Sequence, residues 1–155
     1  MSLPHVLTYL TEREAVADAL YRSIIGFDSY DVSMFDSAWV PDIIFDLNGT
    51  VFNGPDAIRT HVLDLVGPMD TSHTVSNVRV DVKPGATTAS LTAYALAQHC
   101  PPGKGTDPNG PKYLTSSRYF LDLVKDESDG LWKIKKFMMK VIWTQGDRSV
   151  MQRSS

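Results

Sequence analysis

Apolar residues recur every three or four positions from Val16 to Phe27, which is the period of an amphipathic helix. Just before this stretch, Thr11 and Glu14 stand three residues apart, as in a capping box, where each side chain bonds the backbone amide of the other residue. The pattern therefore predicts a first helix that begins after Thr11, ends near Asp28 and carries one apolar stripe.

Shorter elements are expected in the middle of the chain. Asn48 and Gly49 separate two apolar runs, and this dipeptide is a strong signal for a two-residue β-hairpin. Gly54 and Pro55 precede another apolar stripe at helical spacing. The expected elements are a helix at about 32–38 that Pro41 ends, hairpin strands at 43–47 and 51–52, and a third helix at about 55–66.

The second half of the chain is predicted to be a meander of four strands. Pro84 and Gly85 join the first two strands, and a polar turn at 126–130 joins the last two. The segment 100–111 contains four prolines and three glycines, so we expect a loop that covers the mouth of a pocket. The strands are expected at about 70–83, 87–99, 112–125 and 131–144.

Together these elements predict one α+β domain, in which a strongly curved sheet wraps around the N-terminal helices and encloses one pocket. The length of 155 residues fits a single domain, 1–155, with a core that spans about 8–147. The formal charge is −3, and the basic run at 133–140 is local and mixed with apolar residues. Neither feature indicates a nucleic-acid or membrane partner.

Composition excludes several other classes of protein. The single cysteine, Cys100, allows no internal disulfide and fits a reducing compartment. No apolar run approaches the length that crosses a bilayer, and the N-terminal segment lacks the pattern of a secretory signal. The histidines lack metal-ligand spacing, and there is no glycine-rich phosphate loop. We therefore expect a cytoplasmic protein with no metal and no cofactor.

Asp28 and His73 are the leading candidates for chemistry. Asp28 continues the apolar stripe of the first helix, so its carboxylate is expected to point inward, where it needs a partner. His73, or a lysine, can be that partner. A carboxylate holds an imidazole in one tautomer and raises its basicity, and the imidazole then moves protons near neutral pH.

The strand around His73 carries a conflicting pattern. Strict alternation places His73 on one face with Val75 and Asn77, whereas Val78 and Val80 lie on the other face. Either the pocket face is partly polar, or a β-bulge changes the phase of the strand.

Other polar and aromatic residues are weaker candidates. His99 alternates with three alanines, as expected of a pocket wall, although a strand-end histidine near solvent is the alternative. Lys140 lies among apolar residues and is either an electrostatic stabiliser in the pocket or a solvated residue outside it. Tyr94, Tyr113 and Tyr119 are expected to pack, and Trp143 to line the interior or to form part of the core.

The order of these elements resembles the SnoaL-like branch of the nuclear-transport-factor-2-like (NTF2-like) superfamily over about residues 8–147. The resemblance rests on a first helix that ends near Asp28, Phe45-Asp46 before the hairpin, and the segments 54–58, 73–77 and 129–134. It implies a cone with a curved, mixed but mainly antiparallel sheet around an interior pocket.

Within this superfamily, the chain looks most similar to the group of scytalone dehydratase and hexachlorocyclohexane dehydrochlorinase. An Asp at the end of the first helix and a His on the following long strand form the catalytic dyad of that group, and they match Asp28 and His73. The resemblance also implies catalytic roles for His99 and Lys140.

The same resemblance suggests which residues contact the substrate. Scytalone dehydratase has tyrosines at the positions of Phe27 and Leu47, and the dehydrochlorinase has a lysine at the position of Ser23. These differences imply another substrate. The candidate substrate-binding residues are Phe27, Leu47, Tyr94, Thr115, Ser117 and Trp143.

The dyad and the resemblance together indicate a cofactor-independent lyase that eliminates water from a hydrophobic small molecule, such as a polyketide or terpenoid intermediate. A SnoaL-type polyketide cyclase or isomerase would use the same proton steps. A noncatalytic small-molecule binding module is the alternative from another class. The resemblance also implies a homo-oligomer, either a dimer or a trimer.

Overall fold

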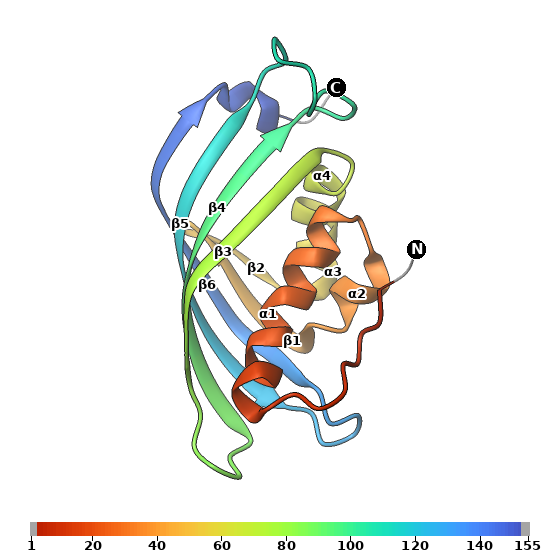
Figure 1. Cartoon of the computed structure of the whole chain (residues 1–155), viewed down its shortest axis with the longest axis vertical. Helices are drawn as coiled ribbons and strands as arrows, with labels where there is room; N and C mark the ends of the chain where they lie inside the picture. The colour runs from red at the N-terminus through yellow and green to blue at the C-terminus, as the bar shows by residue number, and fades with distance from the viewer. Residues whose placement is uncertain (1–2, 153–155) are drawn as a thin grey trace.

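A curved six-stranded sheet, with helices on its concave side, forms the protein (Figure 1). The computed structural model describes residues 3–152. In chain order the elements are α1 (Glu12–Asp28), α2 (Val32–Asp36), β1 (Trp39–Leu47), β2 (Thr50–Asn53), α3 (Pro55–Ile58), the π-helical η1 (Arg59–Leu63), α4 (Asp64–Val66), β3 (Asp70–Asp81), β4 (Thr88–Cys100), β5 (Tyr113–Lys125), β6 (Trp132–Gly146) and the 3₁₀-helical η2 (Arg148–Met151).

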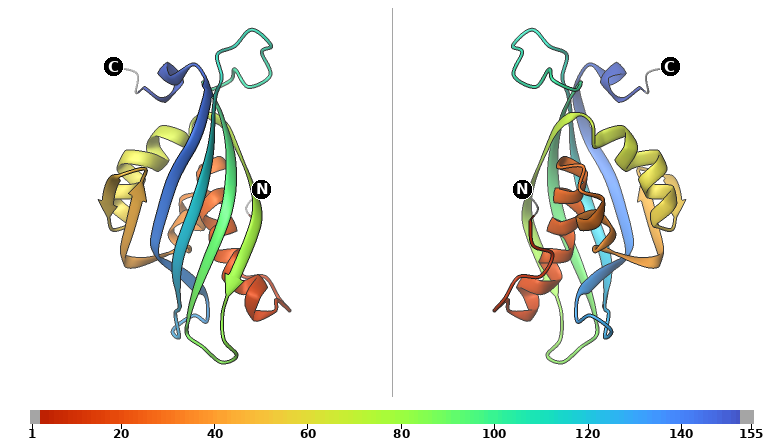
Figure 2. Two further views of the ribbon diagram at one scale, coloured as in Figure 1. Left: turned by 90° about the vertical axis from the view of Figure 1, so that its left-hand side faces the viewer. Right: turned by 90° about the vertical axis from the view of Figure 1, so that its right-hand side faces the viewer.

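The sheet is mixed and open, with the strand order β2-β1-β6-β5-β4-β3. Every neighbouring pair is antiparallel except β1 and β6, which run parallel. The long strands β3 to β6 form the curved wall, and α1 lies across its concave side (Figures 1 and 2). The expected α+β cone is confirmed.

Several contacts fix α1 against the sheet. The capping box is formed: the Thr11 amide donates to Glu14 at 2.7 Å, and the Glu14 amide donates to the Thr11 hydroxyl at 3.2 Å. The buried guanidinium of Arg22 donates to the backbone carbonyls of Ser37 and Trp132, so it ties the helix to the entry of β1 and to β6. These contacts fix the position of α1 along the sheet and thereby place its last residue, Asp28, against β3.

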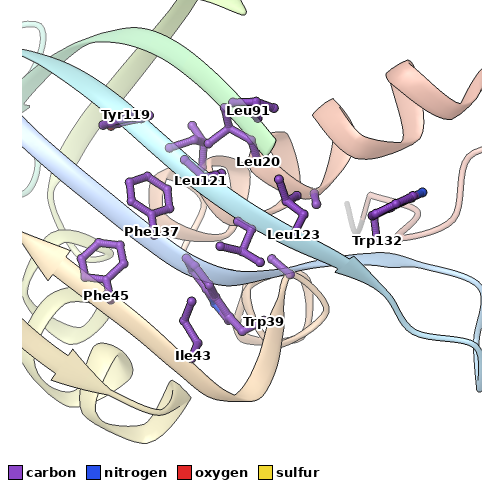
Figure 3. Packing of buried hydrophobic residues seen from close by; sticks show 14 of the residues in the cluster. Leu20, Trp39, Ile43, Phe45, Leu91, Tyr119, Leu121, Leu123, Trp132 and Phe137 are labelled. Carbon is purple, nitrogen blue, oxygen red and sulfur yellow. The ribbon is translucent and has the colours of Figure 1, made fainter. Parts of the chain in front are cut away.

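The hydrophobic core lies between α1 and the concave face of the sheet. Leu20 of α1 lies over inward-pointing leucines of β4 and β5 (Figure 3). Trp39 of β1 is the centre of an aromatic cluster. Its ring centroid lies 5.4–6.4 Å from the rings of Phe27, Phe35, Phe45 and Phe137. Aromatic contacts of this kind stabilise a core beyond the area they bury, so the cluster holds α1, α2, β1 and β6 together.

One expectation about local structure is wrong. Pro41 does not end a helix but lies inside β1, which begins already at Trp39. The register against β6 shifts between Trp39 and Ile44, and a proline fits such an irregularity because no backbone donor is required there. The third helix covers 55–66 as expected, and its middle segment, η1, is π-helical.

A β-bulge resolves the conflicting pattern of β3. The pairing with β4 is interrupted between Ser76 and Arg79, and Asn77 has a φ of 52°. The extra residue changes the phase of the strand, so His73 and Val75 before the bulge share the inner face with Val78 after it. Of the two alternatives that the sequence left open, the bulge is therefore confirmed.

The segment after β4 differs from its expected position. The loop at 101–112 lies beyond the sheet, close to the end that carries η2 (Figure 1). None of its residues lines the central cavity, so the expectation that it covers the pocket mouth is wrong; Arg148 and Met151 of η2 lie there instead. Among residues 3–152, no helix is long and apolar enough to span a bilayer.

Candidate active site

A cavity of about 470 Å³ lies between the concave face of the sheet and the helices. This volume is in the range of small-molecule sites. Ala93, Ala95 and Ala97 of β4 point inward, and their small side chains leave the space open. Apolar side chains from the helices and the sheet form most of the wall, among them Ile24, Phe27, Phe45, Leu47, Val62, Val66, Phe137 and Met139.

Strand register arranges the inward side chains in rows across the sheet. Successive rows lie about 7 Å apart along the strands. The first row contains Thr71, His99 and Tyr113; the second His73, Ala97, Thr115 and Thr144; the third Val75, Ala95, Ser117 and Val141. The chemistry-bearing side chains are thus concentrated toward the end of the sheet that carries η2.

The structure brings Asp28 and His73 into a two-point contact. The Nδ1 atom of His73 lies 2.6 Å from one carboxylate oxygen of Asp28, and the backbone amide of His73 donates to the other oxygen at 2.9 Å. These two hydrogen bonds fix both the backbone and the ring of His73. The Asp28 carboxylate accepts a hydrogen bond from the Nδ1–H group of His73, and in this tautomer Nε2, at the opposite edge of the ring, carries the free lone pair.

Asp28 holds His73 from outside the cavity. His73 lines the cavity, whereas Asp28 borders a separate groove beside the start of β3. The two side chains are 12% and 21% exposed, so the contact is largely shielded from water. Asp28 is therefore a positioning residue, and His73 is the group that can touch a bound molecule.

His99 lies beside the dyad as a neutral imidazole. Its ring meets the ring of His73 edge to face at 5.8 Å, and its Nδ1 lies 3.4 Å from the hydroxyl of Thr71. Burial lowers the pKa of His99 to about 4, with a further lowering by His73 that Asp28 partly opposes. At neutral pH His99 can therefore donate or accept a hydrogen bond in the cavity, but it carries no charge.

The lowered pKa of His99 predicts a loss of stability in acid. The unfolded chain takes up a proton at an ordinary histidine pKa of 6.5, whereas the folded chain resists protonation until about pH 4. The stabilisation is complete above pH 6.5 and is lost as the pH falls toward 4, with a full size of about 3 kcal/mol. We expect urea unfolding across this window to show a steeper decline for wild type than for His99→Gln. His61→Gln, at an exposed histidine, is the control. Identical slopes for wild type and His99→Gln would contradict this explanation.

Two hydroxyl groups of β5 face the cavity, as expected from the sequence. Thr115 lies in the same row as His73, and Ser117 lies one row deeper. The Ser117 side chain is buried, and its hydroxyl has no hydrogen-bond partner in the described structure. Because an unsatisfied buried hydroxyl is unfavourable, a bound molecule that offers an oxygen or a polar hydrogen at this position would gain binding energy.

Three candidates expected in the pocket lie outside it. Lys140 and Tyr94 alternate with inward-pointing residues, so both project from the outer face of the sheet, where Tyr94 stacks under the guanidinium of Arg118. Trp143 is 46% exposed. A register shift in β6 between the partners of Ser116 and Ser117 changes the strand's phase, so Thr144 rather than Trp143 reaches the cavity. Pocket roles for Lys140, Tyr94 and Trp143 are therefore wrong.

Among the further residues that the structure places at the cavity are three that can hydrogen-bond or carry charge and that sequence reasoning did not assign to the site. Tyr113 and Tyr119, which were expected only to pack, line the cavity at either end of the run that contains Thr115 and Ser117. Strict alternation along β5 could have revealed both. Burial raises the pKa of Tyr119, with a smaller effect of Asp28, so its hydroxyl stays protonated. Arg148 of η2 also borders the cavity, and no periodic pattern identified it.

The described part of the chain offers no evident metal site. Between residues 3 and 152, no three side chains of His, Cys, Asp or Glu lie close enough together to hold an ion. The chemistry that can be assigned to the cavity from its own side chains is proton transfer and hydrogen bonding.

Comparison with known proteins identifies the family. A family model described as a SnoaL-like domain matches residues 8–138. The chain is 43% identical over 150 residues to terrestric acid biosynthesis cluster protein E of Penicillium crustosum, a match that covers 96% of each protein. The chain belongs to the SnoaL-like domain family.

Solved structures share the fold at low sequence identity. A scytalone dehydratase-like protein of Novosphingobium aromaticivorans superposes with a TM-score of 0.74, at 22% identity over 88% of each chain. The hexachlorocyclohexane dehydrochlorinase LinA-type3 of Novosphingobium barchaimii gives a TM-score of 0.70, at 18% identity over 88% of this chain and 90% of that one. At these identities the likeness extends to the fold alone.

Proposed function

We propose that this SnoaL-like protein is a cofactor-independent lyase of secondary metabolism that eliminates water from a hydrophobic small molecule, such as a polyketide or terpenoid intermediate. The observation that carries the proposal is the 2.6 Å contact between His73 and Asp28 at the wall of an apolar cavity. The relative from a terrestric acid biosynthesis cluster supports a role in secondary metabolism.

The proposed reaction uses His73 as a general base. Nε2 removes a proton from a carbon that a neighbouring carbonyl makes acidic. The carbon–hydroxyl bond then breaks as the carbon–carbon double bond forms. The proton carried by His73 leaves with the hydroxyl as water, so the dyad returns to its starting state. Asp28 stabilises the imidazolium that exists between the two proton transfers.

Neighbouring groups would hold the substrate oxygens. The neutral imidazole of His99 and the hydroxyl of Thr115 lie within one row of His73, where they can hydrogen-bond the departing hydroxyl. The unpaired hydroxyl of Ser117 can donate to the carbonyl oxygen as negative charge develops on it. Phe27 and Leu47 line the cavity but offer no hydroxyl, so the Ser117 hydroxyl of β5 is the group proposed to polarise the substrate carbonyl.

Incubation with metabolite extracts of the protein's own source tests the proposal. Mass spectrometry would identify species that are consumed by the protein and not by buffer alone. A product lighter by one water supports elimination, whereas a product of unchanged mass would indicate the cyclase or isomerase. A molecule that binds and is never converted would replace the proposal with a noncatalytic binding module.

We propose further that the protein is a homo-oligomer, either a dimer or a trimer. The outer face of the sheet carries exposed apolar side chains, including Phe120, Ile142 and Trp143, and no helix within residues 3–152 covers it (Figure 2). Apolar surface of this kind is typical of contact between chains. Analytical ultracentrifugation of the purified chain measures the state, and a monomer at all concentrations would reject this proposal.

A further inference from the structure

Within residues 3–152, the wall of the cavity carries one permanent positive charge and no negative one. Among these described residues, Arg148 is the only lysine or arginine that lines the cavity, and no Asp or Glu lines it. Asp28, the carboxylate of the dyad, does not line the cavity and accepts hydrogen bonds from His73. An anion that enters this apolar space therefore meets attraction at the mouth and no fixed carboxylate on the wall.

The short helix η2 presents Arg148 to the cavity. Val150 of this helix is buried, which anchors the segment at the end of the sheet, and Met151 lines the cavity beside Arg148. The preceding carboxylate of Asp147 accepts hydrogen bonds from the amide and the hydroxyl of Ser149, at 2.9 and 2.6 Å. Asp147 is thus engaged in capping η2.

Arg148 has no partner for its charge within residues 3–152. Its side chain is exposed and takes part in no ion pair with any described carboxylate. Two other arginines in the described structure do form ion pairs: Arg22 with Asp18, and Arg59 with Asp36. An unpaired guanidinium offers planar, paired donors that match a carboxylate.

We infer that Arg148 binds a carboxylate of the substrate at the cavity mouth, so that the substrate is an apolar carboxylic acid. This inference deepens the proposed function, since it names the substrate class of the same site. Gly146 pairs with Tyr113 in the first row, and His73 lies in the second row. The anion is thus about one to two rows, roughly 7–14 Å, from the dyad. The carboxylate is therefore separated by several bonds from the carbon that loses its proton.

Calorimetric titration with trans-cinnamate and its uncharged amide, cinnamamide, tests the inference. The two probes have nearly the same shape, and only the first is an anion. We expect wild type to bind cinnamate about 10- to 100-fold more tightly than cinnamamide, as expected of a charged hydrogen bond. Arg148→Gln should bind both probes equally. Arg148→Lys should keep part of the preference because it keeps the charge but not the planar donor pair.

Arg79→Gln is the matched control. Arg79 is exposed on β3 and does not line the cavity, and its substitution changes the net charge by the same amount as Arg148→Gln. It should retain the full preference for cinnamate. Equal affinity of wild type for the two probes, binding of neither, or a preference that persists in Arg148→Gln would overturn the inference. Since the titration involves no turnover, acid binding without conversion of any metabolite would reject the proposed function and leave this inference standing. Conversion of a metabolite by a protein that shows no preference for cinnamate would support the proposed function and reject this inference.

Discussion

Substitution of His73 by glutamine is expected to reduce turnover by a factor of about 10²–10⁴, which is the usual contribution of a positioned general base. Glutamine can still accept a hydrogen bond in the cavity, but it has no lone pair basic enough to take a proton from carbon. Binding should remain, because the apolar wall is unchanged. The loss should therefore fall on kcat and leave KM nearly constant.

His61→Gln is the control for this substitution. His61 is exposed and stacks on Phe52 at 5.3 Å, and it does not line the cavity. The same chemical change there should leave turnover unaltered. If His73→Gln kept wild-type kcat while the protein remained folded, His73 would not be the base.

Asp28→Asn is expected to reduce kcat by a factor of order 10³, although asparagine has nearly the same shape. The amide nitrogen of asparagine would donate to Nδ1 of His73, so the imidazole proton would move to Nε2. The nitrogen that faces the substrate would then have no lone pair. The measurement is kcat of Asp28→Asn at saturating substrate, with the unfolding free energy determined in parallel.

Asp18→Asn offers a matched comparison on the same helix. Asp18 pairs with Arg22 at 3.1 Å, away from the cavity, so this substitution should affect stability more than turnover. A full loss of activity in Asp28→Asn that simply followed a loss of folded protein would count against a tautomer effect. Equal kcat for Asp28→Asn and wild type would reject the positioning role altogether.

Much of the fold could be predicted from the sequence, because helices and hairpins leave patterns in residues that are close together in the chain. The capping box at Thr11 and the apolar stripe that follows it define α1, and the hairpin at Asn48 and Gly49 forms as expected, with both residues at positive φ. The position of Asp28 at the end of α1 was likewise readable, since a carboxylate on an apolar stripe demands a partner.

Strand phase was the main obstacle to predicting the site. A single extra residue reverses which side chains face the cavity, and its position depends on pairing with the neighbouring strand. The bulge near Asn77 is one of the two alternatives that the out-of-phase valines around it indicate, and the structure decides between them. The shift that turns Trp143 outward left no such trace, because the residues around it are apolar on both faces.

Residues beyond regular elements were harder still. Arg148 follows the last strand, where neither alternation nor helical spacing applies, so only the folded chain shows that η2 returns to the cavity mouth. Lys140 was the more obvious cation because it interrupts an apolar run. Its neighbours Met139 and Val141 take the inward positions, and Lys140 consequently faces outward.

The central claim is that His73, held by Asp28, removes a proton from carbon in a bound molecule. The most direct test is a parallel incubation of wild type and His73→Gln with metabolite extract in deuterated water, read by mass spectrometry. The account predicts at least one molecule that wild type converts or labels with deuterium and that His73→Gln leaves unchanged. Molecules retained equally by both proteins, with no conversion and no deuterium in either case, would contradict it.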